Sequence, residues 1–464
     1  MSKEPVIAIF DIGKTNKKLL LFDEQYKIVF EQSEQFIEIE DEDGFPCEDV
    51  NLLTNWVRES FSNIIADDQF NVKAVNFSAY GASFVLLDEE SKVIAPLYNY
   101  LKPFPDKLKK DFYSAYGNQT MLCRQTASPA LGNLNAGLQL FRLKYEKQDI
   151  FRNVRYALHL PQYLSFIISK KHYADITSVG CHTHLWDFEN DRYHFWVRKE
   201  GIEDKLAPLQ NCKSVIGFVE QSVAIGVGLH DSSSALIPYL NVFSESFVLI
   251  STGTWCISLN PFNTTPLTDE ELLSDCLCFL SYDGHQVKAS RLFAGYVHEQ
   301  QVKRIASHFN KPVDYYKTVL YSPGIVAILR EINPASACQK DQQGCSSAFE
   351  AISLDVFAGY EEAYHQLMIE IAERQVKSTQ LVLQNSSVRR VFVDGGFSKN
   401  SIYMHLLANA YPELEIYAAS VAQASALGSA LAIHEHWNGQ GLPTDLIEMR
   451  FYASSLSNIS ATSN

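Results

Sequence analysis

A carboxylate beside small polar residues is the first feature of this sequence that could do chemistry. Segment 11–16 (DIGKTN) follows the apolar run at 6–10 and combines Asp, Gly, Thr and Asn. Gly allows close backbone approach, Thr offers a hydroxyl, and Asp supplies the hard oxygen ligand that Mg²⁺ prefers near a phosphate. Lys14 and Lys17 could neutralise phosphate charge. The alternative is an ordinary hairpin turn, because D-x-G is a common turn string.

A second polar turn repeats this design in the middle of the chain. Segment 251–254 (STGT) follows the apolar run at 247–250 and precedes another apolar run at 255–259. Its hydroxyls and backbone N–H groups could cradle a terminal phosphate. Taken alone, this segment fits a plain hairpin equally well. The two turns together, however, predict a nucleotide clamped between two related halves of the chain.

A third segment joins two glycines to the start of a helix. At 394–400 (DGGFSKN) the glycines follow a strand-like run at 391–393, and a helix is expected at 401–410. The glycines permit close approach to a flat base or a phosphate, and the helix presents free N–H groups. The alternative is a strand-to-helix turn in which Ser398 or Asn400 caps the helix.

Asp231 is the candidate general base. It lies in segment 228–235 (GLHDSSSA), shortly before the middle of the chain. A carboxylate at an interdomain cleft could take a proton from a substrate hydroxyl while that oxygen attacks phosphorus. The spacing alone favours a simpler role for Asp231, as an N-cap of the helix that follows.

The elements that would position these segments form an α/β pattern. Strands are expected at 6–10, 18–23, 26–30, 72–77, 84–87, 247–250, 255–259, 391–393 and 414–418, and helices after Asp49 and at 160–169, 357–383, 401–410 and 425–432. Each half opens with a strand, a Gly/Thr turn and a returning strand. We therefore predict two domains, at 1–243 and 244–455, followed by a flexible tail at 456–464.

Length and composition agree with this division. The chain has 464 residues, 54 acidic and 39 basic side chains, a formal charge of −15 and 46% hydrophobic residues. One core rarely serves more than about 250–300 residues, so two or more domains are expected. The acidic balance argues against a nucleic-acid partner but permits a nucleotide substrate. No apolar run approaches the roughly 20 residues of a membrane-spanning helix, and no signal peptide is evident, so we expect a cytoplasmic protein.

Taken in order, these segments resemble the motifs of the FGGY family of carbohydrate kinases, within the sugar kinase/heat-shock 70/actin superfamily. Segments 11–16 and 251–255 look like the family's two phosphate motifs, 394–400 like its adenosine motif, and 422–430 like its closing small-residue helix. His230-Asp231 matches the segment that carries the catalytic Asp. The resemblance implies two actin-like, ribonuclease H-like domains, each a mixed sheet flanked by helices, with the active site in the cleft between them.

The resemblance also implies roles for individual residues. Asp231 would be the catalytic base, and Asp11 would act in catalysis by holding Mg²⁺. ATP would be bound by residues of the phosphate and adenosine motifs, namely Gly13, Lys14, Thr15, Asn16, Lys17, Thr252, Gly253, Thr254, Gly395, Gly396, Ser398 and Asn400. Sugar contacts would come from Gly81, Ala82, Ser83 and His230.

The implied reaction is transfer of the γ-phosphoryl group of ATP to a sugar hydroxyl. The His-Asp dipeptide and the S-x-G-T-W string look most like rhamnulokinases and fuculokinases, so we expect the terminal hydroxyl of a ketose such as L-rhamnulose, L-fuculose or a xylulose-like sugar. Segment 98–102 (YNYLK) departs from the Arg-Asp pair usual in these kinases, and Gln162 replaces their usual Asp, which leaves the sugar open.

Other functions remain as alternatives to a ketose kinase. They are a polyol or aldose kinase of the same family and a non-catalytic relative that senses a sugar or a nucleotide. The expected partners are a small sugar and ATP, with no nucleic acid and no membrane, and a homodimer is compatible with the sequence.

Overall fold

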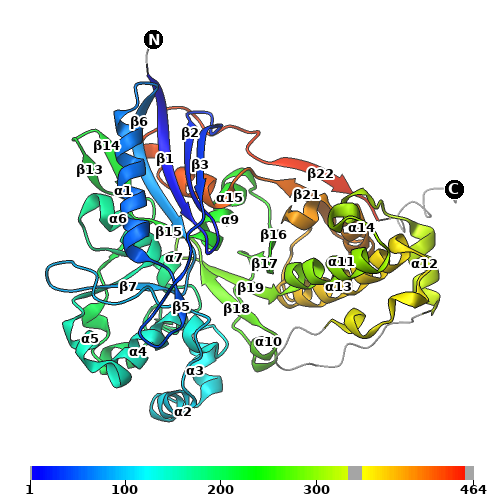
Figure 1. The fold of residues 1–464 in the computed structure, drawn as a ribbon, viewed down its shortest axis with the longest axis horizontal. Helices are drawn as coiled ribbons and strands as arrows, with labels where there is room; N and C mark the ends of the chain where they lie inside the picture. The colour runs from blue at the N-terminus through cyan, green and yellow to red at the C-terminus, as the bar shows by residue number, and fades with distance from the viewer. Residues whose placement is uncertain (1–2, 333–346, 455–464) are drawn as a thin grey trace.

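The computed structural model describes residues 3–332 and 347–454, and these form two α/β lobes (Figure 1). In this part of the chain each lobe is built around a mixed seven-stranded sheet. The predicted α/β class, with two mixed sheets flanked by helices, is confirmed. The tail predicted at 456–464 lies outside the described residues.

The first sheet has the strand order β13-β14-β6-β1-β2-β3, with β15 also beside β6. Its central strand β1 is parallel to β6 and antiparallel to β2. The apolar residues of β1 are fully buried, because helices and neighbouring strands cover both faces. The strands are β1 (Glu4–Ile12), β2 (Lys17–Asp23), β3 (Ile28–Glu34), β6 (Phe70–Ala79), β13 (Val215–Val219), β14 (Val223–Gly226) and β15 (Leu229–His230).

The second sheet has the order β18-β19-β17-β16-β20-β21-β22. Its strand β16 forms an antiparallel hairpin with β17 and a parallel pair with β20, as β1 does with β2 and β6. The repeated strand–turn–strand design predicted for the two halves is therefore present. The strands are β16 (Phe247–Thr252), β17 (Cys256–Asn260), β18 (Cys276–Leu280), β19 (Gln286–Leu292), β20 (Arg390–Gly395), β21 (Glu415–Ser420) and β22 (Glu448–Tyr452).

Short strand pairs join loops of the first lobe. They are β4 (Ile39–Glu40) with β5 (Pro46–Cys47), β7 (Phe84–Leu87) with β8 (Tyr156–His159), β9 (Ala174–Asp175) with β12 (Leu209–Gln210), and β10 (Trp186–Asp187) with β11 (Arg192–Tyr193). The loop between β4 and β5 contains three consecutive acidic residues, Asp41, Glu42 and Asp43.

Helices cover the sheets. Those of the first lobe are α1 (Val50–Ala66), α2 (Asp106–Ala115), α3 (Gln119–Gln125), α4 (Ala136–Glu146), α5 (Gln148–Asn153), α6 (Leu160–Ser169), α7 (Ile176–Val179) and α8 (Phe195–Lys199). They are followed by α9 (Asp231–Val242), α10 (Asp269–Leu273), α11 (Ala294–His308), α12 (Pro323–Ile332), α13 (Tyr360–Leu383), α14 (Ser401–Ala410) and α15 (Ala424–Ala432).

Two predicted elements begin two or more residues later than expected. The helix predicted from residue 357 begins at Tyr360, because Phe357 has an extended backbone after a short 3-10 turn. The strand predicted from residue 26 begins at Ile28, because Tyr26 has a left-handed φ of 61° and closes a turn. Both errors concern turns that the apolar pattern alone does not reveal.

The helices α9 and α15 pack against each other between the two sheets (Figure 1). The Ser234 hydroxyl of α9 donates to the Ser425 carbonyl of α15 at 2.7 Å, and it lies 2.9 Å from the Ser429 hydroxyl. The Asn76 side chain of β6 donates to the Ser429 carbonyl at 2.8 Å. This small-residue helix therefore ties the second half of the chain to the sheet of the first.

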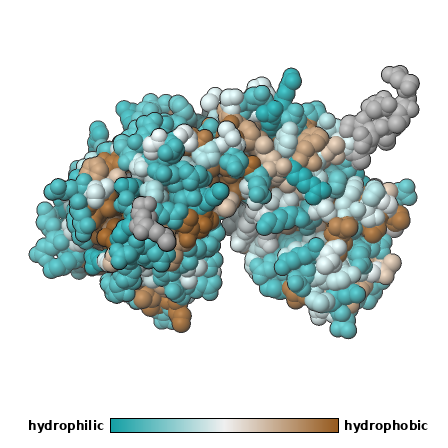
Figure 2. All heavy atoms as spheres, turned by 90° about the horizontal axis from the view of Figure 1, so that it is seen from above, coloured by the Kyte–Doolittle hydropathy of each residue, from teal (hydrophilic) through white to brown (hydrophobic). Residues whose placement is uncertain are grey.

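The outer surface carries only small hydrophobic patches on the face seen in Figure 2, which also shows a notch between the two lobes. Within the described ranges, no helix combines the length and apolar character needed to cross a membrane. The seven cysteines that the structure describes are unpaired and buried.

Three buried histidines of the first lobe link its stability to pH. Burial lowers the pKa of His159, His182 and His184 to about 3 in each case. An unfolded chain protonates histidine near pH 6.5. Between these values the unfolded state binds more protons, so this stability is fully present above about pH 6.5 and is lost as the pH falls toward 3.

We expect His184→Gln to weaken this acid destabilisation. The buried His184 ring is hydrogen-bonded to the hydroxyls of Tyr113 and Thr126, at 3.2 and 2.7 Å. Removing one such group should lower the slope of unfolding free energy against pH by about 1.4 kcal/mol per pH unit between pH 6 and 4. Urea unfolding at several pH values measures the slope, with exposed His436→Gln as control. An unchanged slope in His184→Gln would contradict the prediction.

Candidate active site

A backbone hydrogen bond closes each of the two polar turns, across three residue positions in the first and two in the second. In the first, between β1 and β2, the Gly13 amide donates to the Asn16 carbonyl at 2.9 Å. In the second, between β16 and β17, the Gly253 amide donates to the Trp255 carbonyl at 2.9 Å. The residues between the two bonded positions, which include Thr15 in the first turn and Thr254 in the second, form the tip of each turn.

The lysines of the first turn are engaged with the protein. The Lys17 ammonium donates to the carbonyls of Gly13 and Lys14, at 3.2 and 2.9 Å, and to the Glu48 carboxylate. These three bonds use all its protons and bury the side chain, so Lys17 holds the backbone of the turn. Lys14 is more exposed and pairs with Glu38 at 2.6 Å.

Asp231 is the first residue of α9. Its Oδ1 accepts from the Ser232 amide at 2.6 Å and lies 3.2 Å from Nε2 of His230. The side chain is 32% exposed, and no hydrogen bond within the described residues involves Oδ2. The N-cap position belongs to His230, and no side chain caps the helix, so the capping interpretation of Asp231 is wrong. The carboxylate lies at the positive end of the helix dipole, and its Oδ2 has no hydrogen-bond partner among the described residues.

Asp11 lies at the end of β1 in an unfavourable electrostatic environment. Desolvation, with the negative charge of Asp231 as a second cause, raises the pKa of Asp11 to about 7, while Ser78 and Lys18 oppose the rise. Two mutually repelling carboxylates beside a phosphate-sized turn suit a divalent cation. In the described ranges no group of three or more His, Cys, Asp or Glu side chains could hold a metal. This donor set fits Mg²⁺, which commonly keeps several waters and binds one or two protein carboxylates together with phosphates.

The predicted sugar loop, residues 81–83, lies against the His230-Asp231 dipeptide. A Cβ on Gly81 would lie 3.0 Å from the His230 ring and 3.2 Å from the Cys181 sulfur, so a larger residue would require these side chains to shift. The following Ala82 has a left-handed φ of 59°, a conformation that costs energy without glycine and is common at functional sites. The Ser83 hydroxyl is buried and has no hydrogen-bond partner among the described residues. Such a group suits a ligand hydroxyl or a water.

A cleft of about 700 Å³ opens in the second lobe beside the second turn and the third segment. Of the predicted nucleotide contacts it is lined by Thr252, Gly253, Gly396 and Asn400. The other lining residues, which sequence reasoning missed, are Gly295, His298, Tyr316, Lys317, Val319, Leu320, Phe397, Lys399, Ser401, Arg450 and Tyr452. They come from several distant segments, so no local motif could have identified them. The volume is typical of a small-molecule site.

Hydrogen bonds and close backbone packing fix the conformation of the third segment. Gly395 has φ +89°, and a Cβ on it would lie 2.0 Å from the Thr252 carbonyl, so glycine is needed where β20 meets β16. The Ser398 hydroxyl donates to the Gly395 carbonyl at 2.8 Å. Asn400 caps α14 through its side-chain oxygen, as one sequence interpretation proposed. Its amide donates to the Tyr364 hydroxyl at 2.7 Å.

Comparison with known proteins gives this fold and site a family. Residues 6–235 match the model of the N-terminal domain of the FGGY family of carbohydrate kinases, and residues 322–433 match the C-terminal domain of the same family. The chain belongs to the FGGY family of carbohydrate kinases, and it is an ATP-dependent sugar kinase with two actin-like domains.

Individual relatives agree with this assignment. A rhamnulokinase of Oceanobacillus iheyensis is 20% identical over 453 residues, covering 91% of both chains. One of Mannheimia succiniciproducens is 22% identical and covers 91% of this chain and 88% of its own. Among solved structures, a ligand-bound xylulose kinase of Lactobacillus acidophilus has a TM-score of 0.80 at 16% identity, covering 98% of this chain and 95% of its own. A carbohydrate kinase of Novosphingobium aromaticivorans has a TM-score of 0.77 at 20% identity, covering 97% and 95%.

Proposed function

We propose that this kinase phosphorylates the terminal hydroxyl of a ketose such as L-rhamnulose, L-fuculose or a xylulose-like sugar. The observation that carries the proposal is the free Oδ2 of Asp231 at the start of α9, beside the sugar loop and the Asp11 turn. The similarity to rhamnulokinases, at 20–22% identity, supports a ketose.

In this proposal Asp231 is the general base. Its Oδ2 accepts the proton of the sugar hydroxyl as that oxygen attacks the γ-phosphorus of ATP. The Ser232 amide and His230 hold Oδ1, which orients the carboxylate before the sugar arrives. Gly81, Ala82, Ser83 and His230 would contact the sugar.

The phosphates of ATP would lie between the two turns. The turn at 13–16, which includes Thr15 and Asn16, would contact them from the first lobe, and Thr252, Gly253 and Thr254 from the second. Gly395, Gly396, Ser398 and Asn400 would border the adenosine. Asp11 would hold Mg²⁺, and the bound ion would neutralise charge on the β- and γ-phosphates. Closure of the two lobes would exclude water, so that the sugar is phosphorylated in its place.

We further propose a cytoplasmic enzyme that uses a small sugar and ATP and has no nucleic-acid or membrane partner. The acidic composition supports the absence of a nucleic-acid partner. A homodimer is part of the proposal and can be tested by size-exclusion chromatography with light scattering.

A sugar panel in a coupled ADP assay tests the proposed reaction. We expect ADP release to depend on the presence of a sugar. We expect kcat/KM to be highest for a ketose with a free terminal hydroxyl, because Asp231 is proposed to accept the proton of that hydroxyl. Polyols and aldoses of the same carbon number are the matched comparisons. A polyol or aldose as the best substrate would replace the ketose proposal, and ATP binding without turnover on any sugar would indicate a non-catalytic sensor.

A further inference from the structure

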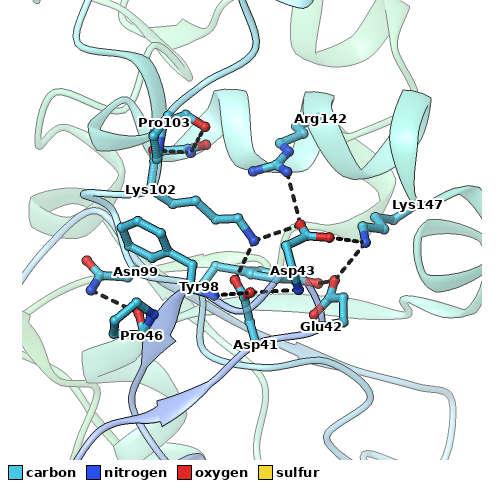
Figure 3. Close-up of polar contacts among 12 residues, drawn as sticks. Asp41, Glu42, Asp43, Pro46, Tyr98, Asn99, Lys102, Pro103, Arg142 and Lys147 are labelled. Carbon is cyan, nitrogen blue, oxygen red and sulfur yellow. Dashed lines mark hydrogen bonds and ion pairs between the residues drawn. The ribbon is translucent and has the colours of Figure 1, made fainter.

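The segment Tyr98–Lys102 is held in an ion-pair network (Figure 3). The Lys102 ammonium binds the Asp41 carboxylate and also lies 2.8 Å from that of Asp43, both in the turn between β4 and β5. Figure 3 shows Arg142 of α4 and Lys147 pointing toward Asp43 from the other side, at 3.2 and 2.9 Å. We call the ion pairs of Lys102 with Asp41 and Asp43 the Lys102 clamp.

The Lys102–Asp41 ion pair of the clamp is buried, whereas the Asp43 side chain is 35% exposed. The side chains of Lys102 and Asp41 are 6% and 0% exposed, and the bonds from Lys102 and Lys147 lower the pKa of Asp43 to about 2. Buried ion pairs contribute little net stability compared with apolar packing, and one established use for them is to set a unique arrangement. The clamp therefore indicates that this loop must adopt one conformation.

The backbone on both sides of Tyr100 is also held by hydrogen bonds, which the side chains of Asn99 and Asn133 make. The Asn99 amide donates to the Pro46 carbonyl at 3.1 Å, and its side-chain oxygen accepts from the Leu101 amide at 3.0 Å. Asn133 donates to the Lys102 carbonyl at 2.6 Å. Tyr100 is thus presented from a turn that is held on both sides.

The same connections reach the predicted sugar loop. Gln139 of α4 donates to the carbonyl of Asn133 and to that of Ala82, each at 2.7 Å. Ala82 is the residue with the left-handed backbone beside the catalytic dipeptide. The network therefore positions Tyr100 and the sugar loop together.

Tyr100 is half-buried and turned toward the catalytic side of the lobe. Its ring meets that of Tyr80 edge to face, with centroids 6.1 Å apart, and Tyr80 directly precedes the sugar loop. Burial raises the pKa of Tyr100, and Asp231 is the first charge that adds to this rise, ahead of Glu48 and Glu38. Tyr100 therefore lies near the proposed base as well as near the sugar loop.

The lysines of this region are neutralised. Lys14, Lys17 and Lys102 are each paired with a carboxylate. A carboxylated sugar would need a cation, and these three are already engaged. The half-buried Tyr100 ring can pack on sugar C–H groups, and its hydroxyl can bond a sugar hydroxyl.

We propose that Tyr100 contacts the sugar and determines specificity for a neutral sugar over an aldonate, and that Lys102 is a positioning residue that holds Tyr100 in place through the clamp. This inference rests on the proposed function, because it places the sugar beside Asp231.

The first test compares steady-state kinetics of Tyr100 variants. Tyr100→Ala should raise the KM for the sugar by about 10-fold or more, with Tyr100→Phe between it and the wild type, because contacts to one face of the sugar are lost. The KM for ATP should stay within about twofold. An unchanged sugar KM in Tyr100→Ala, or an equal rise in both KM values, would overturn the assignment.

The second test separates positioning from folding. Lys102→Met should reproduce the rise in sugar KM with an unchanged ATP KM, whereas Lys102→Arg, which can still pair with both carboxylates, should restore most of the affinity. Exposed Lys92→Met is the matched control. If Lys102→Met does not fold, Asn99→Ala loosens the same turn with the ion pairs intact. Wild-type kinetics in the folded variants would refute the role of the clamp.

The third test addresses substrate class and stays independent of turnover. Calorimetric titration without ATP should show binding of neutral ketoses that is about 10-fold or more tighter than that of aldonates of equal length. The same titration should show that Tyr100→Ala weakens the binding of neutral ketoses. Tighter binding of aldonates, or no binding of neutral sugars by the wild type, would overturn this inference. Normal sugar binding without any ADP release would instead refute the proposed function alone.

Discussion

Asp231→Asn should lower kcat on the true sugar by about 10²–10⁴-fold while the protein keeps its fold and its affinity for ATP. The amide has nearly the same shape and can still accept the Ser232 bond at Oδ1, so α9 should start unchanged. What it loses is the basic oxygen, because the group at the Oδ2 position can no longer accept a proton from the sugar hydroxyl. The effect should therefore fall on kcat and leave substrate binding largely intact.

Coupled ADP assays with saturating sugar and ATP measure this loss, and ADP titration confirms that nucleotide binding survives. Asp106→Asn is the matched control, because Asp106 also lies in the first turn of a helix but far from the cleft in sequence and with no part in the site. Near-normal turnover of Asp231→Asn would rule out Asp231 as the base and would direct attention to Asp11.

Gly428→Ala should destabilise the protein by about 3 kcal/mol, although alanine is the better helix former by roughly 1 kcal/mol. A Cβ on Gly428 of α15 would lie 1.8 Å from the Ser234 carbonyl of α9, so the two helices would have to separate. Ser234 lies one turn after Asp231 in the same helix. A displaced α9 should also move the base, and we expect kcat to fall together with stability.

Urea unfolding followed by circular dichroism gives the change in free energy, and the coupled assay gives kcat on the same preparation. Gly439→Ala is the control, because a Cβ there has no heavy atom within 4 Å. Since helix propensity alone predicts a gain, a Gly428→Ala protein as stable as the wild type would show that α9 and α15 can separate at little cost.

Secondary structure followed closely from local patterns. The helices at Leu160–Ser169 and Ser401–Ala410 have the predicted bounds, and Asp49 caps α1 by accepting from two backbone amides. These features depend on apolar periodicity and on caps, which are properties of neighbouring residues. The late start of α13 at Tyr360 is an error of the same local kind.

The chemistry of single side chains was harder to predict. Lys17 and Lys14 stand in the same turn, yet Lys17 is buried with Glu48 and Lys14 is partly exposed. Asp231 was favoured as a helix cap, but the structure leaves its Oδ2 free. In each case the role of the side chain depends on which groups lie next to it in the folded protein, and the local sequence does not show this.

The sequence by itself determined the α/β class, the two strand–turn–strand units and the order of motifs that identifies a sugar kinase, because backbone conformation and periodicity are encoded over a few neighbouring residues. Only the tertiary structure decided which charges are free and which are paired. The Lys102 clamp joins residues about sixty positions apart, and the cleft of the second lobe gathers Gly295, Tyr316 and Arg450 from separate elements. Burial and ion pairing arise from such long-range contacts, so a residue's type and local spacing cannot reveal them.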